Sequence, residues 1–170
     1  NTKTIMIQAF ITSCGRTDLL KKTLDSFSEN MPHKVFITIH EDGLSKIGQH
    51  SSIEKFIHTC QEKYVLFMEE DWIIDNSYDW IQKSIDILES DPSIIKVLCR
   101  SDSPHNPEEF NDGWGYLKNW KGNDGIVWCG FSWNCGVTRM DILKKFVPFA
   151  KWEQDVAWQI RQAGYKVAML

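Results

Sequence analysis

The stretch Tyr64-Val65-Leu66-Phe67-Met68-Glu69-Glu70-Asp71 places five apolar residues directly before three acidic ones. An apolar run without Gly or Pro is typical of a short strand that is buried on both faces. Three carboxylates at the end of such a strand repel one another unless a cation lies among them. The same pattern also suits a solvated acidic turn after a core strand, so the triplet alone leaves both interpretations open.

Predicted strands and helices alternate on both sides of this stretch. Apolar runs predict strands at residues 5–12, 35–40, 64–71, 95–99 and 165–170. Apolar residues at helical spacing predict helices at residues 17–29, 46–62, 77–88 and 153–163, and a further helix that starts at Thr138. Such alternation indicates an α/β fold with a mainly parallel central sheet and helices on both faces. A chain of 170 residues is expected to form a single domain.

A long irregular segment over residues 101–127 interrupts this alternation. It contains several glycines and the aromatic residues Trp114, Tyr116 and Trp120. A loop of this length inside a compact domain is usually a lid or a binding loop. A poorly ordered insertion is the alternative, but the aromatic content favours a binding loop.

Composition and charge exclude several classes of partner and site. A net charge of −4 and a pI of about 5.7 argue against binding of nucleic acid or of an anionic membrane surface. The five cysteines show no ligand or paired spacing, which favours reduced core cysteines over disulfides or zinc. Without a signal peptide or an apolar run of transmembrane length, we expect a cytoplasmic protein with no transmembrane segment. The chain opens on Asn rather than Met, as a fragment of a longer protein would.

Acidic residues gather where three predicted elements end or begin. Glu41-Asp42 and Glu69-Glu70-Asp71 follow parallel strands and should project from one sheet edge, the edge where open α/β sheets bind ligands. Hard carboxylate oxygens select Mg²⁺ or Mn²⁺, and such an ion commonly completes its shell with substrate phosphates. Glu41 and Asp42 can hydrogen-bond a base or ribose, or only form a turn. Asp155 at a helix start can be a general base, or only a favourable partner of the helix dipole.

Taken together and in order, these motifs resemble the GT-A-fold glycosyltransferases, most closely glycosyltransferase family 2. Residues 10–16 and the helix after them are similar to the nucleotide-binding opening of that family. Glu69-Glu70-Asp71 is similar to its DxD metal motif, with Asp71 at the metal-ligating position. Glu153-Gln154-Asp155, with Arg161 and Gly164-Tyr165 downstream, resembles its ED motif. Glutamates at the first two positions of the metal motif and Gln154 in the second motif depart from the family pattern.

The resemblance implies a single GT-A (Rossmann-like) domain over residues 1–170. Residues 1–100 would form the nucleotide-sugar-binding half, and residues 101–170 the acceptor-binding and catalytic half. The implied activity is a metal-dependent, inverting transfer of a sugar from a nucleotide-sugar, with a UDP-sugar as the first expectation, to a hydroxyl of a glycan or other acceptor. Mn²⁺ or Mg²⁺ on Asp71 would neutralise the donor diphosphate. Asp155 would deprotonate the acceptor hydroxyl, with Glu153 as the second candidate.

The remaining site residues fall into two groups. The predicted nucleotide-sugar ligands are Thr12, Ser13, Cys14, Arg16, Glu41, Asp42, Glu69 and Glu70. The predicted acceptor-binding residues are Trp114, Trp128, Trp133 and Trp152, since apolar sugar faces pack well on indole, although each can equally be a core residue.

Two other functions compete with glycosyl transfer. A nucleotide-sugar- or carbohydrate-binding module of the same fold, without turnover, is favoured by Gln154. A nucleotidyltransferase would need a Gly-rich phosphate loop after the first strand, and the turn over residues 13–16 is too short for one.

Overall fold

The computed structural model describes residues 6–31, 33–42, 47–75, 79–99, 113–118, 120–121, 127–128 and 130–170. Within these residues the central sheet has seven strands, in the order β2 (Lys34–Glu41), β1 (Met6–Ser13), β3 (Tyr64–Glu69), β8 (Gly136–Arg139), β4 (Ile94–Leu98), β9 (Lys166–Met169) and β5 (Gly115–Tyr116). All strands except β8 and β5 run in one direction. The short strands β6 (Trp120–Lys121) and β7 (Val127–Trp128) form a separate antiparallel pair.

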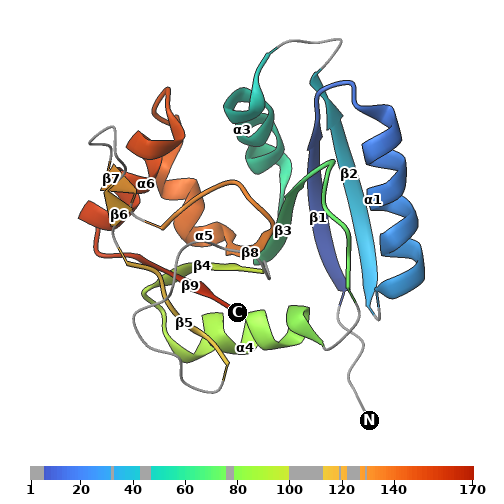
Figure 1. The fold of residues 1–170 in the computed structure, drawn as a ribbon. Helices are drawn as coiled ribbons and strands as arrows, with labels where there is room; N and C mark the ends of the chain where they lie inside the picture. Colours follow the sequence, from blue (N-terminus) through green and yellow to red (C-terminus); the bar gives the residue numbers. More distant parts are fainter. Residues whose placement is uncertain are drawn as a thin grey trace.

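Helices cover both faces of the sheet (Figure 1). α1 (Thr17–Asn30) and α4 (Trp80–Ser90) pack on one face, against residues such as Ile7, Ala9 and Ile11 of β1. α3 (Gln49–Thr59), α5 (Met140–Leu143) and α6 (Glu153–Gln162) pack on the other face, against Phe10 of β1 and Phe67 of β3. A short 3-10 helix, η1 (Lys144–Phe146), follows α5. The predicted α/β architecture with a mainly parallel sheet and helices on both faces is therefore confirmed.

One central strand escaped the sequence prediction. Thr138 and Arg139, expected to start a helix, belong to β8, and the helix begins at Met140. β8 is inserted antiparallel between β3 and β4, and all four of its residues are buried. A short strand buried on both faces shows no alternation of polar and apolar residues, which is why the pattern gave no signal for it.

The predicted long segment lies mostly outside the described residues. Of its described parts, Gly115 and Tyr116 form β5 and pair with the last strand, β9. The prediction of a lid or binding loop for the rest of residues 101–127 is therefore not addressed by the structure. Of the four cysteines in the described parts of the chain, Cys60 and Cys135 are buried, as predicted for core cysteines, and Cys99 is partly buried, whereas Cys14 is exposed. No helix in those same parts is both long and apolar enough to cross a bilayer.

Candidate functional site

The carboxyl ends of β2, β1 and β3 lie side by side and bring most of the predicted site residues together. Ser13 pairs in register with Glu41, and Thr12 with Glu69. The Ser13 hydroxyl donates to Glu41 Oε2 at 2.6 Å. Both carboxylate oxygens of Asp42 accept from the backbone N–H of Gly48 at 3.1 Å, so Asp42 connects the end of β2 to the start of α3. The expected convergence of these groups at one sheet edge is thus observed.

Glu69 connects this edge to α3. Its Oε1 accepts a hydrogen bond of 3.1 Å from Gln49 Nε2, which also lies 3.3 Å from Thr12 Oγ1. Burial raises the pKa of the Glu69 carboxyl, and the neighbouring Asp71 and Glu70 raise it further against the opposing effect of the Gln49 hydrogen bond. Gln49, which sequence reasoning did not select, is therefore part of the site. Its place at the start of a predicted helix gave no signal of that role.

Glu70 ties the turn after β1 to the end of β3. Its side chain is only 3% exposed, and its Oε1 accepts from Arg16 Nε at 2.7 Å and from Cys14 N and Cys14 Sγ at 3.2 Å each. Its backbone carbonyl accepts from Thr23 Oγ1 of α1 at 2.6 Å. Burial alone would raise the pKa of this carboxyl, but the hydrogen bonds from Arg16 and Cys14 outweigh burial and lower it. Glu70 is thus an ionised carboxylate that orders the turn.

Asp71 is the most open of the three acids. Its side chain is 39% exposed, and its Oδ2 lies 3.2 Å from Arg16 Nη1. The cation that the acidic triplet requires is therefore supplied in this structure by the Arg16 guanidinium, which bridges Glu70 and Asp71. Arg16 was predicted to contact the donor. Its ion pairs with Glu70 and Asp71 show that it also joins the turn after β1 to the end of β3.

The carboxylates at this edge can bind a divalent ion only if a bound substrate supplies further ligands. Among the described residues, no cluster of three or more metal-type side chains surrounds a common point. A half-exposed carboxylate such as Asp71 can still bind Mg²⁺ or Mn²⁺ when substrate phosphates and water supply the other ligands. Asp71 is the residue that would hold such an ion, and a bound diphosphate would have to complete its shell.

The first turn of α6 presents two acids in different environments. Glu153 is partly buried, and its Oε1 accepts from the backbone N–H of Trp133 at 2.7 Å. Burial raises the pKa of the Glu153 carboxyl, although this N–H and the charge of Lys96 oppose the change. Asp155 is exposed to solvent. Since successive residues turn by about 100° on a helix, two acids two positions apart face different directions.

Lys96 on β4 is a buried cation that sequence reasoning missed. It is fully buried, and its Nζ donates to the backbone carbonyl of Ser132 at 2.8 Å. Its Nζ also lies 5.8 Å from the ring centre of Phe67 and 5.6 Å from that of Phe131. Burial lowers the pKa of Lys96 from the ordinary 10.5 to about 8. A single lysine within the apolar run Ile94–Leu98 was the available signal.

The four predicted sugar-stacking tryptophans occupy different environments. Trp133 is 2% exposed and packs against Phe131 and Phe149, so the prediction that it stacks on a sugar is wrong and it is a core residue. Trp152 is 60% exposed, with Lys151 Nζ 4.8 Å from its ring centre. Trp114 is half-buried, edge-on to Tyr116. Trp128 lies in β7, and the direction of its side chain is outside the described part of the structure.

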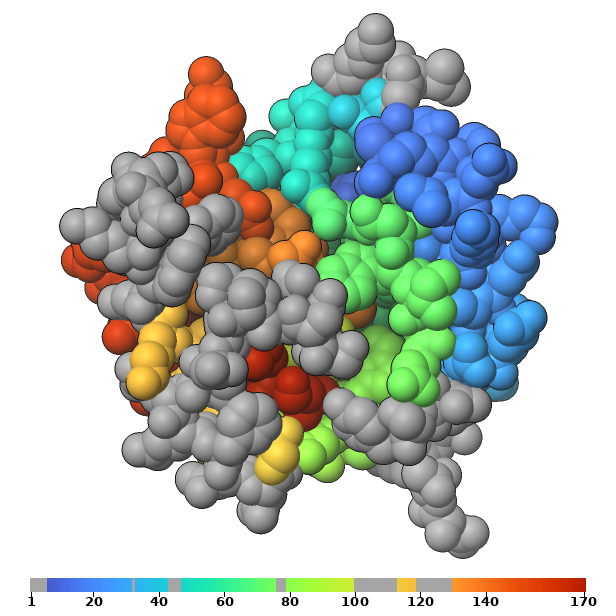
Figure 2. Space-filling model, viewed as in Figure 1, coloured from blue at the N-terminus to red at the C-terminus, as the bar shows by residue number. Residues whose placement is uncertain are grey.

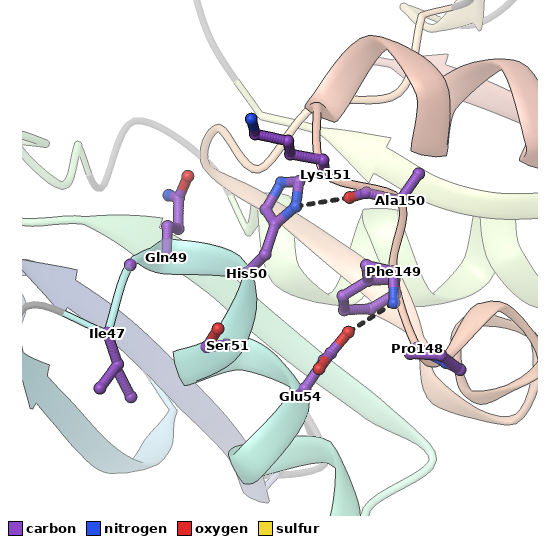
Figure 3. A pocket seen from close by; sticks show the side chains of 10 residues that line it. Ile47, Gln49, His50, Ser51, Glu54, Pro148, Phe149, Ala150 and Lys151 are labelled. Carbon is purple, nitrogen blue, oxygen red and sulfur yellow. Dashed lines mark hydrogen bonds between the residues drawn. The ribbon is translucent and has the colours of Figure 1, made fainter.

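A groove of about 430 Å³ opens between the start of α3 and residues 148–151. His50 Nδ1 lies 2.9 Å from the carbonyl of Ala150, and Glu54 accepts from the backbone N–H of Phe149, as Figure 3 shows. In the space-filling view, α3 and the orange-red segment around residue 150 stand apart at the upper rim (Figure 2). Gln49 lines this groove and also contacts Glu69, so the groove adjoins the strand-end site.

Comparisons with known proteins define the fold. No protein-family model and no curated protein matches the chain. A mannosyltransferase, PcManGT from Pyrobaculum calidifontis in complex with GDP-Man and Mn²⁺, superposes with a TM-score of 0.64 at 12% identity over 99% of this chain and 57% of that one. S. aureus TarS 1–349 in complex with UDP-GlcNAc gives 0.62 at 9% identity over 98% of this chain and 56% of that one. A second structure of TarS 1–349 gives 0.59 at 10% identity.

These similarities establish the class of fold. The chain has the GT-A-like fold of these glycosyltransferases, and it spans a little more than half the length of each. The assignment to glycosyltransferase family 2 still rests on the sequence motifs alone.

Proposed function

We propose that the chain is the donor-binding and catalytic core of a nucleotide-sugar-dependent glycosyltransferase. The observation that carries this proposal is the convergence of Arg16, Glu69 and Asp71 at the carboxyl edge of three parallel strands. In open α/β sheets this edge is where ligands bind. Proteins with similar folds have been solved in complex with GDP-Man and with UDP-GlcNAc, so guanine and uracil are both candidates for the base of the donor.

The donor diphosphate needs positive charge that the chain supplies sparsely. Arg16 is 46% exposed, so its guanidinium can turn from Asp71 toward a phosphate while Glu70 still holds its Nε. Asp71 would then be free to bind Mn²⁺ or Mg²⁺ together with the diphosphate. The ion would stabilise the diphosphate as a leaving group. Ser13, Glu41 and Asp42, beside the same edge, are proposed to meet the ribose and base.

The proposed transfer is a single in-line displacement. A carboxylate takes the proton of the acceptor hydroxyl while the acceptor oxygen forms a bond to the anomeric carbon. The bond from that carbon to the diphosphate oxygen breaks, and the nucleoside diphosphate leaves. The anomeric configuration is therefore inverted. The resemblance to family 2 predicts Asp155 as this base, and the inward-facing Glu153 is the second candidate on the same helical turn.

The proposed halves of the chain divide these tasks. Residues 1–100 carry the strand ends and Arg16, which would hold the donor. Residues 101–170 carry α6 and the exposed Trp152, which would meet the acceptor, a hydroxyl on a glycan or another molecule. The groove between α3 and residues 148–151 lies along the boundary between these halves.

Calorimetric titration with GDP and UDP, with and without Mn²⁺, tests the donor site. We expect Mn²⁺ to raise the affinity for one of the two nucleotides in the wild type, and Asp71→Ala to abolish that increase. Arg16→Ala should weaken binding both with and without Mn²⁺. Lys22→Ala and Asp86→Ala, which remove an exposed lysine and an exposed acid from α1 and α4, are the matched controls. Equal affinity in the wild type and in both site variants would contradict the proposal.

A further inference from the structure

The peptide group between Ser132 and Trp133 is hydrogen-bonded at both ends by charged side chains. Its carbonyl oxygen accepts from Lys96 Nζ at 2.8 Å, and its N–H donates to Glu153 Oε1 at 2.7 Å. A cation on the carbonyl and a carboxylate on the N–H polarise the same amide in the same sense, so each bond strengthens the other. One peptide group thus connects the centre of the sheet to the first turn of α6.

Local features of the sheet direct Lys96 to this peptide. The pairing of β4 with β9 shifts register between Ile94 and Lys96, and such irregularities re-aim side chains. Ile95 and the Lys96 ammonium accordingly lie on the same side, in the layer under α3, α5 and α6. On the neighbouring strand, Gly136 leaves room for the lysine, because a Cβ there would lie 2.8 Å from Lys96 Cε.

Packing alone does not account for a lysine at this position. A buried charge carries a desolvation penalty, and it is strongly destabilising when its partner is lost. An apolar residue of similar volume is often neutral or stabilising at such a site. Among the described residues, Lys96 Nζ donates one hydrogen bond, and it goes to the peptide that also holds Glu153.

We propose that Lys96 is a positioning residue for Glu153: through the Ser132–Trp133 peptide it fixes this carboxylate as the group that takes the proton from the acceptor hydroxyl. The proposal rests on the proposed glycosyl transfer and selects Glu153 over Asp155 as its base. Glu153 is held in one orientation by a backbone donor, whereas no hydrogen bond from a described residue supports the exposed side chain of Asp155 in this way.

The charges around the pair favour this role. Lys96 faces Glu69 from β3, Cys99 at the end of β4, Cys135 before β8 and Glu153 from α6. Glu153 is subject to burial and to the negative charge of Glu69, and both raise the pKa of its carboxyl. The Trp133 N–H and Lys96 act in the opposite direction. The net result is a raised pKa for the Glu153 carboxyl, and a raised pKa makes a carboxylate a better proton acceptor.

Two readouts test the proposal in Lys96→Met, which keeps an unbranched side chain, one atom shorter, and removes its charge. The first is the pH titration of the Trp133 amide resonance by NMR, since its N–H donates to Glu153. The second is the pH dependence of kcat/KM for release of nucleoside diphosphate in the presence of acceptor. Lys144→Met is the matched control, because Lys144 Nζ also donates to a backbone carbonyl, that of Cys60, rather than to the Ser132–Trp133 peptide.

We expect the midpoint of the Trp133 titration and the acidic limb of kcat/KM to rise together by about one pH unit in Lys96→Met. Both should stay unchanged in Lys144→Met, and Glu153→Gln should abolish the amide titration. The Trp133 titration of the wild type requires no variant, so it tests the link to Glu153 even if Lys96→Met folds poorly.

An unchanged midpoint in folded Lys96→Met would overturn the positioning role. Full turnover in Glu153→Gln with loss of turnover in Asp155→Asn would also overturn it, while leaving the proposed glycosyl transfer intact. Absence of turnover in the wild type with every donor would instead contradict the proposed function, whatever the amide titration shows.

Discussion

Replacing Lys96 by Met should change how the free energy of unfolding depends on pH. In the native state the pKa of Lys96 is about 8, against the ordinary 10.5 of an unfolded chain. Between these two values the unfolded state binds more protons than the native state, so the stability of the wild type rises with pH in this window. A variant without the ammonium lacks this contribution.

The size of the effect follows from the shift in pKa. One pKa unit corresponds to about 1.36 kcal/mol, so a full shift of roughly 2.5 units amounts to about 3 kcal/mol. From about pH 6.5 to about pH 9.5, linkage predicts that the wild type gains about 2 kcal/mol relative to Lys96→Met. Groups that titrate in this range without interacting with Lys96 cancel in the difference, whereas the buried thiols of Cys99 and Cys135 interact with Lys96 and add a smaller difference of their own.

Urea unfolding at a series of pH values measures this difference directly. The free energy of unfolding of the wild type should rise with pH relative to that of Lys96→Met, because only the wild type is relieved of a buried charge. Lys144→Met, an altered lysine that is not buried, should run parallel to the wild type. Parallel curves for Lys96→Met and the wild type would refute the conclusion that burial destabilises this ammonium.

The remaining predictions concern the turn after β1, the tryptophans and the base. Glu70→Gln should cost about 1–3 kcal/mol of stability, since Arg16 loses its buried partner, and should weaken nucleotide binding in calorimetry. Trp133→Ala should cost about 3–5 kcal/mol in urea unfolding. Trp152→Ala should cost less than about 0.5 kcal/mol but raise KM for the acceptor. Glu153→Gln should lower kcat by roughly 10²–10⁴-fold while donor binding persists.

Each of these has a result that would contradict it. Unchanged nucleotide affinity in Glu70→Gln would separate the turn from the donor site. A stable Trp133→Ala, or a strongly destabilised Trp152→Ala, would reverse the assignment of core and surface. Loss of donor binding in Glu153→Gln would mark that carboxylate as a donor ligand rather than a base.

The sequence predicted the strand that carries the acidic triplet but not the tasks of its three carboxylates. An apolar run followed by acids fixes a buried strand and a polar edge, and both are present in β3. The partner of Glu70 is Arg16, 54 positions earlier in the chain, and such a pair has no local signal. Sequence alone therefore located the site and left open which acid orders the turn and which stays accessible.

The features that sequence reasoning missed share one physical cause. β8 and Lys96 both lie at the centre of the sheet, where burial on both faces removes the periodicity that distinguishes strands from helices. From the sequence, Trp133 could equally stack on a sugar or pack in the core. Only its contacts with Phe131 and Phe149 show that it is a core residue. Long-range packing, not local pattern, determined each of these outcomes.

The configuration of the product tests the central claim most directly. Wild-type protein, Mn²⁺ and a panel of GDP- and UDP-sugars with hydroxyl acceptors would be followed by NMR at the anomeric proton. We predict that one donor loses its sugar, that the nucleoside diphosphate is released, and that the new glycosidic bond has the inverted anomeric configuration. Binding of a nucleotide-sugar without any turnover would favour a non-catalytic binding module, and a product with retained configuration would contradict the in-line displacement.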